Sequence, residues 1–283
     1  MPKTIALNIV SILTAIILVF LLFIPQVFAW EQLDQGLWLG EFESSQKSLI
    51  GDSKVTVLKI NPKLYSLTLI SSSEQNIGSM TVEKWSEKFD LIALLNASMY
   101  LQDHETSTGY MKNYKHINNS NINSEFGAFL AFNPINEIEP EVQIIDKYHQ
   151  NWKGLIKKYN TVIQNYRMIS IKQENVWSQQ KNMYSIACVG IDMQRNVLFI
   201  HTKSPYSVHD FNNIILNLPL DINNVMYVEG GPEASLFVKT NDFIGKWMGS
   251  YETGFFDNSN TKFWPIPNVI GIKRKSHKDI EKK

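Results

Sequence analysis

The chain has 283 residues, and its 27 basic and 27 acidic side chains give a formal net charge of zero. This balance excludes the strongly basic surface of a typical nucleic-acid-binding protein, so we expect no nucleic-acid partner. The single cysteine, Cys188, excludes an intrachain disulfide, and hydrophobic residues at 44% are ample for a large core.

Residues 1–29 have the pattern of an export signal. Lys3 precedes an apolar run from Ile5 to Ile24, and Val27-Phe28-Ala29 provides small or β-branched residues for a signal peptidase. An apolar run of about 20 residues is also long enough to span a bilayer. We therefore expect an exported protein, periplasmic or extracellular. Whether the segment is cleaved or kept as a membrane anchor stays open.

The remaining chain is expected to form a leading segment at 30–53, one domain at 54–270 and a charged tail at 271–283. Apolar spacing, caps and turn residues predict the elements within it. In chain order they are a strand within 30–51, strands at 54–60 and 65–70 joined as a hairpin by Asn61-Pro62-Lys63, a helix carrying Val82, Trp85 and Phe89, and a strand at 91–95. Then follow a strand at 126–132, a helix at 148–159, strands at 184–191 and 197–202, a helix at 208–217 and a strand at 225–228.

The predicted fold class is mixed α/β. We expect one domain in which the strands at 91–95, 184–191, 197–202 and 225–228 meet in a central mixed sheet flanked by helices. The strand, helix, strand order from 197 to 228 predicts a local crossover unit.

The strand at 225–228 ends at a tight turn with two carboxylates. Glu229 is followed by Gly230 and Gly231, which permit backbone angles that other residues resist, and Pro232 then fixes φ. Glu233 follows as the chain leaves the turn. The stretch is consistent with a plain strand end bearing solvated glutamates or with one edge of a site.

Two further segments carry polar side chains beside apolar runs. Asn96 and Tyr100 follow the strand at 91–95, and Arg167 lies in the apolar run from Thr161 to Ser170. A buried arginine needs a partner. Arg167 is structural if it pairs with a carboxylate, and it can hold a phosphate bidentately if it faces a cleft.

Three motifs together resemble the phosphodiester glycosidase family, and the likeness is closest to its exported bacterial branch. The motifs are Asn-Ala-Ser-Met-Tyr at 96–100, the pair 163–167 and 184–192, and Tyr-Val-Glu-Gly-Gly-Pro-Glu at 227–233. The sequence departs from the family pattern where Glu229 stands in place of aspartate and Ser98 in place of glycine. The resemblance covers roughly residues 54–236.

The resemblance implies hydrolysis of sugar-1-phosphate linkages in envelope or extracellular glycans. It implies Glu229 as the catalytic carboxylate, with Glu233 second and Asp192 third. The substrate-binding residues that it implies are Asn96, Tyr100, Arg167, Gly230 and Gly231. No His/Cys cluster has metal-ligand spacing, so we expect no metal and no cofactor. The expected partner is a carbohydrate or phosphorylated glycan, with the membrane added if the N-terminal segment is uncleaved.

Two other functions remain open from the sequence. One is a non-catalytic glycan-binding or polysaccharide assembly protein that uses the same cleft. The other is a membrane-tethered structural protein in which the motifs only make the fold.

Overall fold

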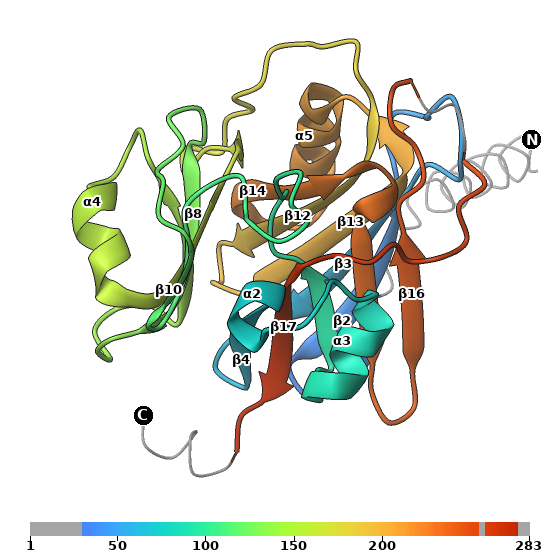
Figure 1. The fold of residues 1–283 in the computed structure, drawn as a ribbon. Helices are drawn as coiled ribbons and strands as arrows, with labels where there is room; N and C mark the ends of the chain where they lie inside the picture. The colour runs from blue at the N-terminus through green and yellow to red at the C-terminus, as the bar shows by residue number, and fades with distance from the viewer. Residues whose placement is uncertain (1–29, 255–257, 277–283) are drawn as a thin grey trace, which may run out of the picture.

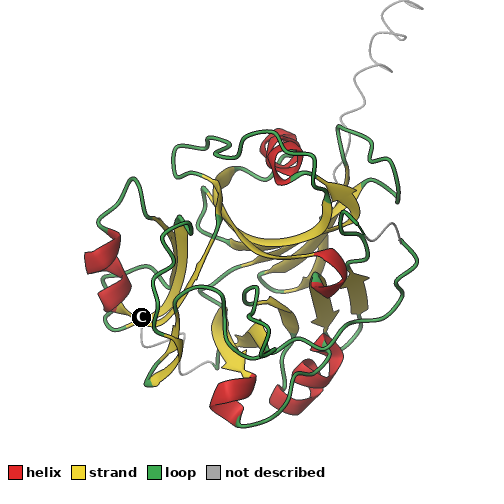
Figure 2. Cartoon of the chain, turned by 45° about the horizontal axis from the view of Figure 1, so that its top comes forward, coloured by secondary structure: helices red, strands yellow, loops and turns green. Residues whose placement is uncertain are grey.

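The computed structural model describes residues 30–254 and 258–276. Three sheets form the body of this part of the chain, and short helices lie on the outside (Figures 1 and 2). The protein is therefore mixed α/β with sheet dominating. The expected mixed sheet is corrected, because all the strand pairs found among the described residues are antiparallel.

The predicted signal or anchor at 1–29 lies outside the described residues. Among the helices that are described, none is long and apolar enough to cross a membrane.

The largest sheet has seven strands in the order β1-β2-β3-β13-β12-β14-β11. These strands are β1 (Glu31–Asp34), β2 (Leu37–Glu43), β3 (Lys54–Ile60), β11 (Arg167–Ile169), β12 (Tyr184–Asp192), β13 (Val197–Tyr206) and β14 (Ile222–Gly230). Its first two strands come from the leading segment, so that segment is built into the sheet.

Two five-stranded sheets pack beside it, in the orders β16-β15-β5-β17-β4 and β7-β6-β10-β8-β9. The first contains β4 (Tyr65–Ser71), β5 (Ala93–Asn96), β15 (Ser235–Lys239), β16 (Ile244–Met248) and β17 (Asn268–Arg274). The second contains β6 (Met111–Asn113), β7 (His116–Asn119), β8 (Ala128–Pro134), β9 (Val142–Asp146) and β10 (Tyr159–Asn165).

The helices are α2 (Ser72–Gln75), α3 (Val82–Phe89), α4 (Trp152–Leu155) and α5 (Val208–Asn217), with two 3-10 turns, η1 (Ile156–Lys158) and η2 (Gly231–Glu233). Two of them confirm predictions. The helix through Val82, Trp85 and Phe89 is α3, and the helix at 208–217 is α5. The Ser207 hydroxyl accepts a hydrogen bond from the Asp210 amide and so caps α5.

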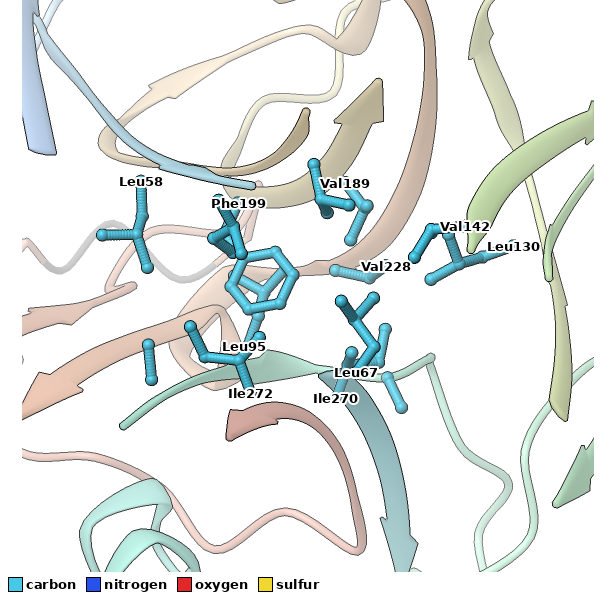
Figure 3. Packing of buried hydrophobic residues seen from close by; sticks show 14 of the residues in the cluster. Leu58, Leu67, Leu95, Leu130, Val142, Val189, Phe199, Val228, Ile270 and Ile272 are labelled. Carbon is cyan, nitrogen blue, oxygen red and sulfur yellow. The ribbon is translucent and has the colours of Figure 1, made fainter. Parts of the chain in front are cut away.

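The main core lies where the three sheets face one another. Phe199 comes from the seven-stranded sheet, Leu95 from one five-stranded sheet and Leu130 from the other, and all three are fully buried (Figure 3). Removing so much apolar surface from water is the main stabilising contribution to this arrangement. It also fixes the ends of β5 and β14 relative to each other.

The predicted crossover from β13 through α5 to β14 is confirmed, with one addition. Strand β12 lies between β13 and β14 and pairs antiparallel with both, so the two outer strands run in the same direction. Helix α5 covers the outer face of this sheet (Figure 1), with Phe211 and Ile215 buried against it. The strand predicted at 91–95 is β5, which belongs to a different sheet from the other three that were expected to join it.

The predicted hairpin of 54–60 and 65–70 is wrong. The chain does turn at Asn61, whose carbonyl accepts hydrogen bonds from the amides of Leu64 and Tyr65. However, β3 pairs with β2 and β13, whereas β4 pairs with β17. Alternating apolar residues identify a strand but not its partner, and here the turn carries the chain from one sheet to another.

The helix predicted at 148–159 is much shorter. Helix α4 begins only at Trp152, and Tyr159 already belongs to β10. The side-chain oxygen of Asn151 accepts a hydrogen bond from the Gly154 amide, which starts the helix late. Tyr148 precedes this cap and is exposed.

Candidate active site

The turn after β14 projects two glutamates from rigid elements. Strand β14 ends at Gly230, η2 spans Gly231–Glu233, and β15 begins at Ser235. Gly231 has a φ of 69°, in the left-handed region that glycine adopts without a Cβ penalty. Pro232 then occupies the first turn of η2, where its missing N–H costs nothing.

Gly230 has an extended backbone that any residue could adopt, so glycine is required here for a steric reason. A Cβ on this residue would overlap the hydroxyl oxygen of Tyr227, which reaches past it from the same strand. The Tyr227 side chain can therefore pack against the turn only while position 230 carries no side chain.

The turn borders a pocket of about 760 Å³. Carboxylates, amides and aromatic rings dominate its wall. Its lining residues are Met99, Tyr100, Leu101, Gln102, His104, Thr108, Tyr166, Trp177, Gln180, Asn182, Tyr184, Val208, Tyr227, Glu229, Gly230, Glu233 and Glu252. A pocket of this size and lining suits a small polar ligand such as one or two sugar rings.

Glu229 forms part of the pocket wall and is only 8% exposed. The pKa of its carboxyl is raised to about 8, mainly by burial and also by the nearby carboxylates of Glu233 and Glu252, while a hydrogen bond from the Gly230 amide acts to lower it. Glu229 therefore holds a proton at neutral pH.

Glu233 is half-buried, and its pKa is also raised. Burial is the largest cause and the Glu252 carboxylate adds to it, while a hydrogen bond with the Tyr100 hydroxyl acts in the opposite direction. Burial raises the pKa of Tyr100 as well, and Glu233 and Glu229 reinforce the effect. Tyr100 therefore stays protonated and can donate to Glu233.

Glu252 is the site residue that sequence reasoning missed. It lies in the segment after β16, which docks against the start of β12: the Ser185 amide donates to the Tyr251 carbonyl at 2.8 Å, and Glu252 bridges to Tyr184. No motif marks this glutamate. Its place in the pocket results from a contact between segments about 65 residues apart.

Aromatic side chains line the same pocket as the carboxylates. The rings of Tyr166 and Trp177 meet edge to face with centroids 5.3 Å apart, and the Trp177 indole donates to the Arg167 carbonyl at 2.7 Å. Tyr184 also lines the pocket. Such rings commonly pack against the apolar faces of sugars and attract cations.

Asn96 does not line the pocket. It is 1% exposed, and its Nδ2 donates to the Glu233 carbonyl at 3.0 Å while its Oδ1 accepts from the Ser235 amide at 2.8 Å. The expectation that it contacts sugar hydroxyls is corrected: it ties the end of β5 to the backbone of the η2 turn. Asn96 is thus a positioning residue for Glu233.

Arg167 also lies outside the pocket lining. Its Nη1 contacts the two carboxylate oxygens of Asp146 at 2.8 and 2.9 Å, and its guanidinium lies over the Tyr148 ring. Burial acts to raise the pKa of Asp146, but hydrogen bonds from His149, the Tyr148 amide and Arg167 lower it overall. The sequence left two roles open for Arg167. The structure shows the pairing with a carboxylate and not a position in the pocket from which the side chain would hold a phosphate.

Asp192 lies at the far end of β12 from the pocket. Its Oδ1 accepts from the Asn196 amide at 2.7 Å and its Oδ2 from the Asn196 side chain at 2.8 Å. Opposite it on β14 is Ile222, whereas Gly230 of the site pairs with Ile186. Asp192 is therefore a turn residue, and its candidacy as a third catalytic carboxylate is withdrawn.

The pocket contains neither lysine nor arginine among its lining residues. Its one side chain able to become a cation is His104, an exposed residue at the rim whose ring lies 5.4 Å from that of Tyr100. Within the described residues, no group of three or more His, Cys, Asp or Glu side chains could hold a metal ion.

The described chain thus combines a sheet-rich fold with one pocket that holds a carboxylate pair at a Gly-Gly turn and several aromatic side chains. The model of the phosphodiester glycosidase family matches residues 89–273, which is more than half of the chain and contains all three pocket glutamates. The chain belongs to this family.

Solved structures share the fold. The catalytic domain of zebrafish N-acetylglucosamine-1-phosphodiester alpha-N-acetylglucosaminidase, auto-inhibited by its pro-peptide, superposes with a TM-score of 0.57 at 11% identity, covering 88% of this chain and 87% of its own. A hypothetical protein from Synechocystis gives 0.55 at 11% identity, covering 85% and 62%. No curated protein sequence matches significantly.

Proposed function

We propose that the protein is a glycosidase that hydrolyses the bond between the anomeric carbon of a sugar and a phosphate in envelope or extracellular glycans. The observation that carries the proposal is the pairing of Glu229 and Glu233, both with raised pKa, in one pocket. Carboxyl groups tuned toward neutral pH beside a sugar-sized cavity are typical of glycoside hydrolysis. Family membership supports the phosphodiester linkage.

The two glutamates take different roles. Glu233, the less buried of the two, accepts a proton as water attacks the anomeric carbon, and the Tyr100 hydroxyl holds its carboxylate in place. The bond from the anomeric carbon to the phosphate oxygen breaks, and the electron pair leaves with the phosphate. Because no lysine or arginine lines the pocket, the proton on Glu229 offsets the charge on that oxygen.

The cellular location is part of the same proposal. The charged start and apolar run of residues 1–29 support export to the periplasm or the extracellular space, either free or held at the cytoplasmic membrane.

A second candidate function is non-catalytic glycan binding in the same pocket. The observation in its favour is that the lining of the pocket lacks a lysine or arginine to hold the phosphate, because Arg167 is paired with Asp146. The two candidates differ in whether the bound glycan is cleaved.

The test is hydrolysis of 4-nitrophenyl diesters of sugar 1-phosphates. A glycosidase releases sugar and 4-nitrophenyl phosphate, so colour appears only after a phosphatase is added, and oxygen from ¹⁸O-water enters the sugar. Glu229→Gln and Glu233→Gln should each lower kcat by about a hundredfold or more. Glu137→Gln, an exposed glutamate away from the pocket, should leave kcat unchanged.

Glu229→Asp restores the residue usual in the family. It shortens the side chain by one methylene and tests the reach of the carboxylate, and activity is retained if the pocket tolerates the shift. Binding of the diesters without any turnover would contradict the glycosidase proposal and support the second candidate function, glycan binding.

A further inference from the structure

The pocket has an unbalanced charge that the proposed reaction does not explain. Hydrolysis uses Glu229 and Glu233, but Glu252 contributes a third carboxyl group. None of the three pairs with a lysine or arginine in the part of the chain that the structure describes. Glu252 is exposed and Glu233 is half-buried, so a cationic group that enters the pocket can reach both carboxylates.

Two of these carboxylates face the same point. A Cβ placed on Gly231 would lie 3.3 Å from Oε2 of Glu252 and 3.6 Å from Oε2 of Glu233. The glycine thus leaves an open space between two oxygen acceptors at the pocket wall.

A hydroxyl group in the same pocket has no partner among the described side chains and backbone groups. Tyr227 is 7% exposed and lines the pocket, yet its hydroxyl makes no hydrogen bond with another described residue. A hydroxyl at a pocket wall that has no protein partner is free to bond to water or to a polar ligand. Tyr227 therefore marks this wall as one that a polar ligand contacts.

The group that fits is an organic cation. The three glutamates do not form a metal-binding set, as no such set occurs among the described residues. An ammonium group offers three donors to the carboxylates, and its charge is attracted to the faces of aromatic rings, of which Tyr166, Trp177 and Tyr184 line the same pocket. A second anion in the same place would be repelled.

We propose that the sugar bound in this pocket carries a free, protonated amino group, which the carboxylates of Glu233 and Glu252 bind. The proposal rests on the proposed function and narrows its substrate to glycans with unacylated amino sugars. The phosphate of such a substrate then lies toward the rim, where His104 is the nearest group able to carry positive charge.

The test uses pairs of probes that differ only in acylation. Glucosamine and galactosamine 1-(4-nitrophenyl phosphate) are compared with their N-acetyl forms, as both anomers, in kinetics and in direct binding to Glu229→Gln. The free amine should bind at least tenfold more tightly at low ionic strength. Added salt should reduce this preference because it screens the attraction between the ammonium group and the carboxylates.

Glu252→Gln should remove most of the preference by weakening the free amine alone, while Glu137→Gln should retain it. Equal or tighter binding of the N-acetyl form overturns the proposal, as does an equal loss for both forms in Glu252→Gln. Turnover without a preference for the amine leaves the glycosidase standing and ends only the amino-sugar proposal. Preferential binding of the free amine without turnover would support the amino-sugar proposal and end the glycosidase proposal. If neither form binds, both proposals fail.

Discussion

The side chain of Asn96 holds the backbone of Glu233, 137 residues further along the chain, through a hydrogen bond from Nδ2 to the carbonyl oxygen at 3.0 Å. With the second bond to the Ser235 amide, this single side-chain amide fixes the backbone where η2 ends and β15 begins. The position of Glu233 in the pocket therefore depends on a residue that does not line the pocket.

Replacing Asn96 with alanine should damage both stability and catalysis. The buried Ser235 amide loses its partner and the Glu233 carbonyl keeps only its bond from the Ser235 hydroxyl, so the free energy of unfolding should fall by about 1–3 kcal/mol. kcat should fall with little change in KM, because the carboxylate shifts. Urea unfolding and steady-state kinetics measure the two effects. Asn217→Ala, which removes an exposed amide bonded to the Asn213 carbonyl, is the control and should change neither. If Asn96→Ala is destabilised but keeps the wild-type kcat, Asn96 contributes to stability and not to the positioning of Glu233 for catalysis.

Gly230 and Tyr227 should behave as a coupled pair. Gly230→Ala places a methyl group on the Tyr227 hydroxyl and should cost about 1–3 kcal/mol of stability. Tyr227→Phe removes the obstructing oxygen, so the double variant should be more stable than the sum of the single effects predicts. Denaturant unfolding of the four proteins gives the coupling energy. Additive effects would show that the turn moves aside instead.

Glu229 should make the protein less stable as pH rises. Its pKa is near 4.5 in the unfolded chain and about 8 in the folded protein, so between these values the folded state binds more protons. Stability that is fully present below about pH 4.5 is then lost progressively up to about pH 8, by an amount on the order of a few kcal/mol. Glu233 acts in the same direction.

The comparison with Glu229→Gln isolates this effect. The variant cannot ionise, so its unfolding free energy should exceed that of the wild type at pH 9 and approach it at pH 5. Urea unfolding at both pH values provides the measurement. Parallel pH profiles for the two proteins would mean that Glu229 is not buried as a neutral acid.

Arg167 should matter for folding and not for ligand binding. Arg167→Met leaves the buried carboxylate of Asp146 without its cation, at a cost of about 3 kcal/mol. The folded fraction should keep the KM of the wild type for a sugar phosphodiester. Thermal unfolding and kinetics check both statements. A tenfold rise in KM at unchanged stability would show instead that Arg167 binds the phosphate of the substrate.

The features that could be predicted from sequence are those that local residues determine. Helix α5 follows from its apolar spacing and Ser207 cap, and the glutamate turn follows from Gly230, Gly231 and Pro232 at the end of an apolar strand. The amino-acid pattern within about ten residues contains all the information needed for each of these.

The rest depends on contacts between distant segments. The partner of Arg167 is Asp146, the partner of Asn96 is the η2 backbone, and Glu252 enters the pocket only because its segment docks on β12. No spacing rule relates these positions. For the same reason the strands at 54–60 and 65–70 were recognised while their pairing was not.

Strand β17 has a consequence for the order in which the protein can assemble. It pairs with β4 on one side and β5 on the other, so it sits inside its sheet although it is the last strand of the described chain. Until residues 268–274 have left the ribosome, the inner edges of β4 and β5 lack the strand that lies between them, and exposed edges invite pairing with other chains. Completion of this sheet, and with it the fixed position of Asn96 opposite Val269, must therefore wait until β17 has been synthesised. A chain shortened by its final strand would lose the middle of a sheet and, through Asn96, the support for Glu233.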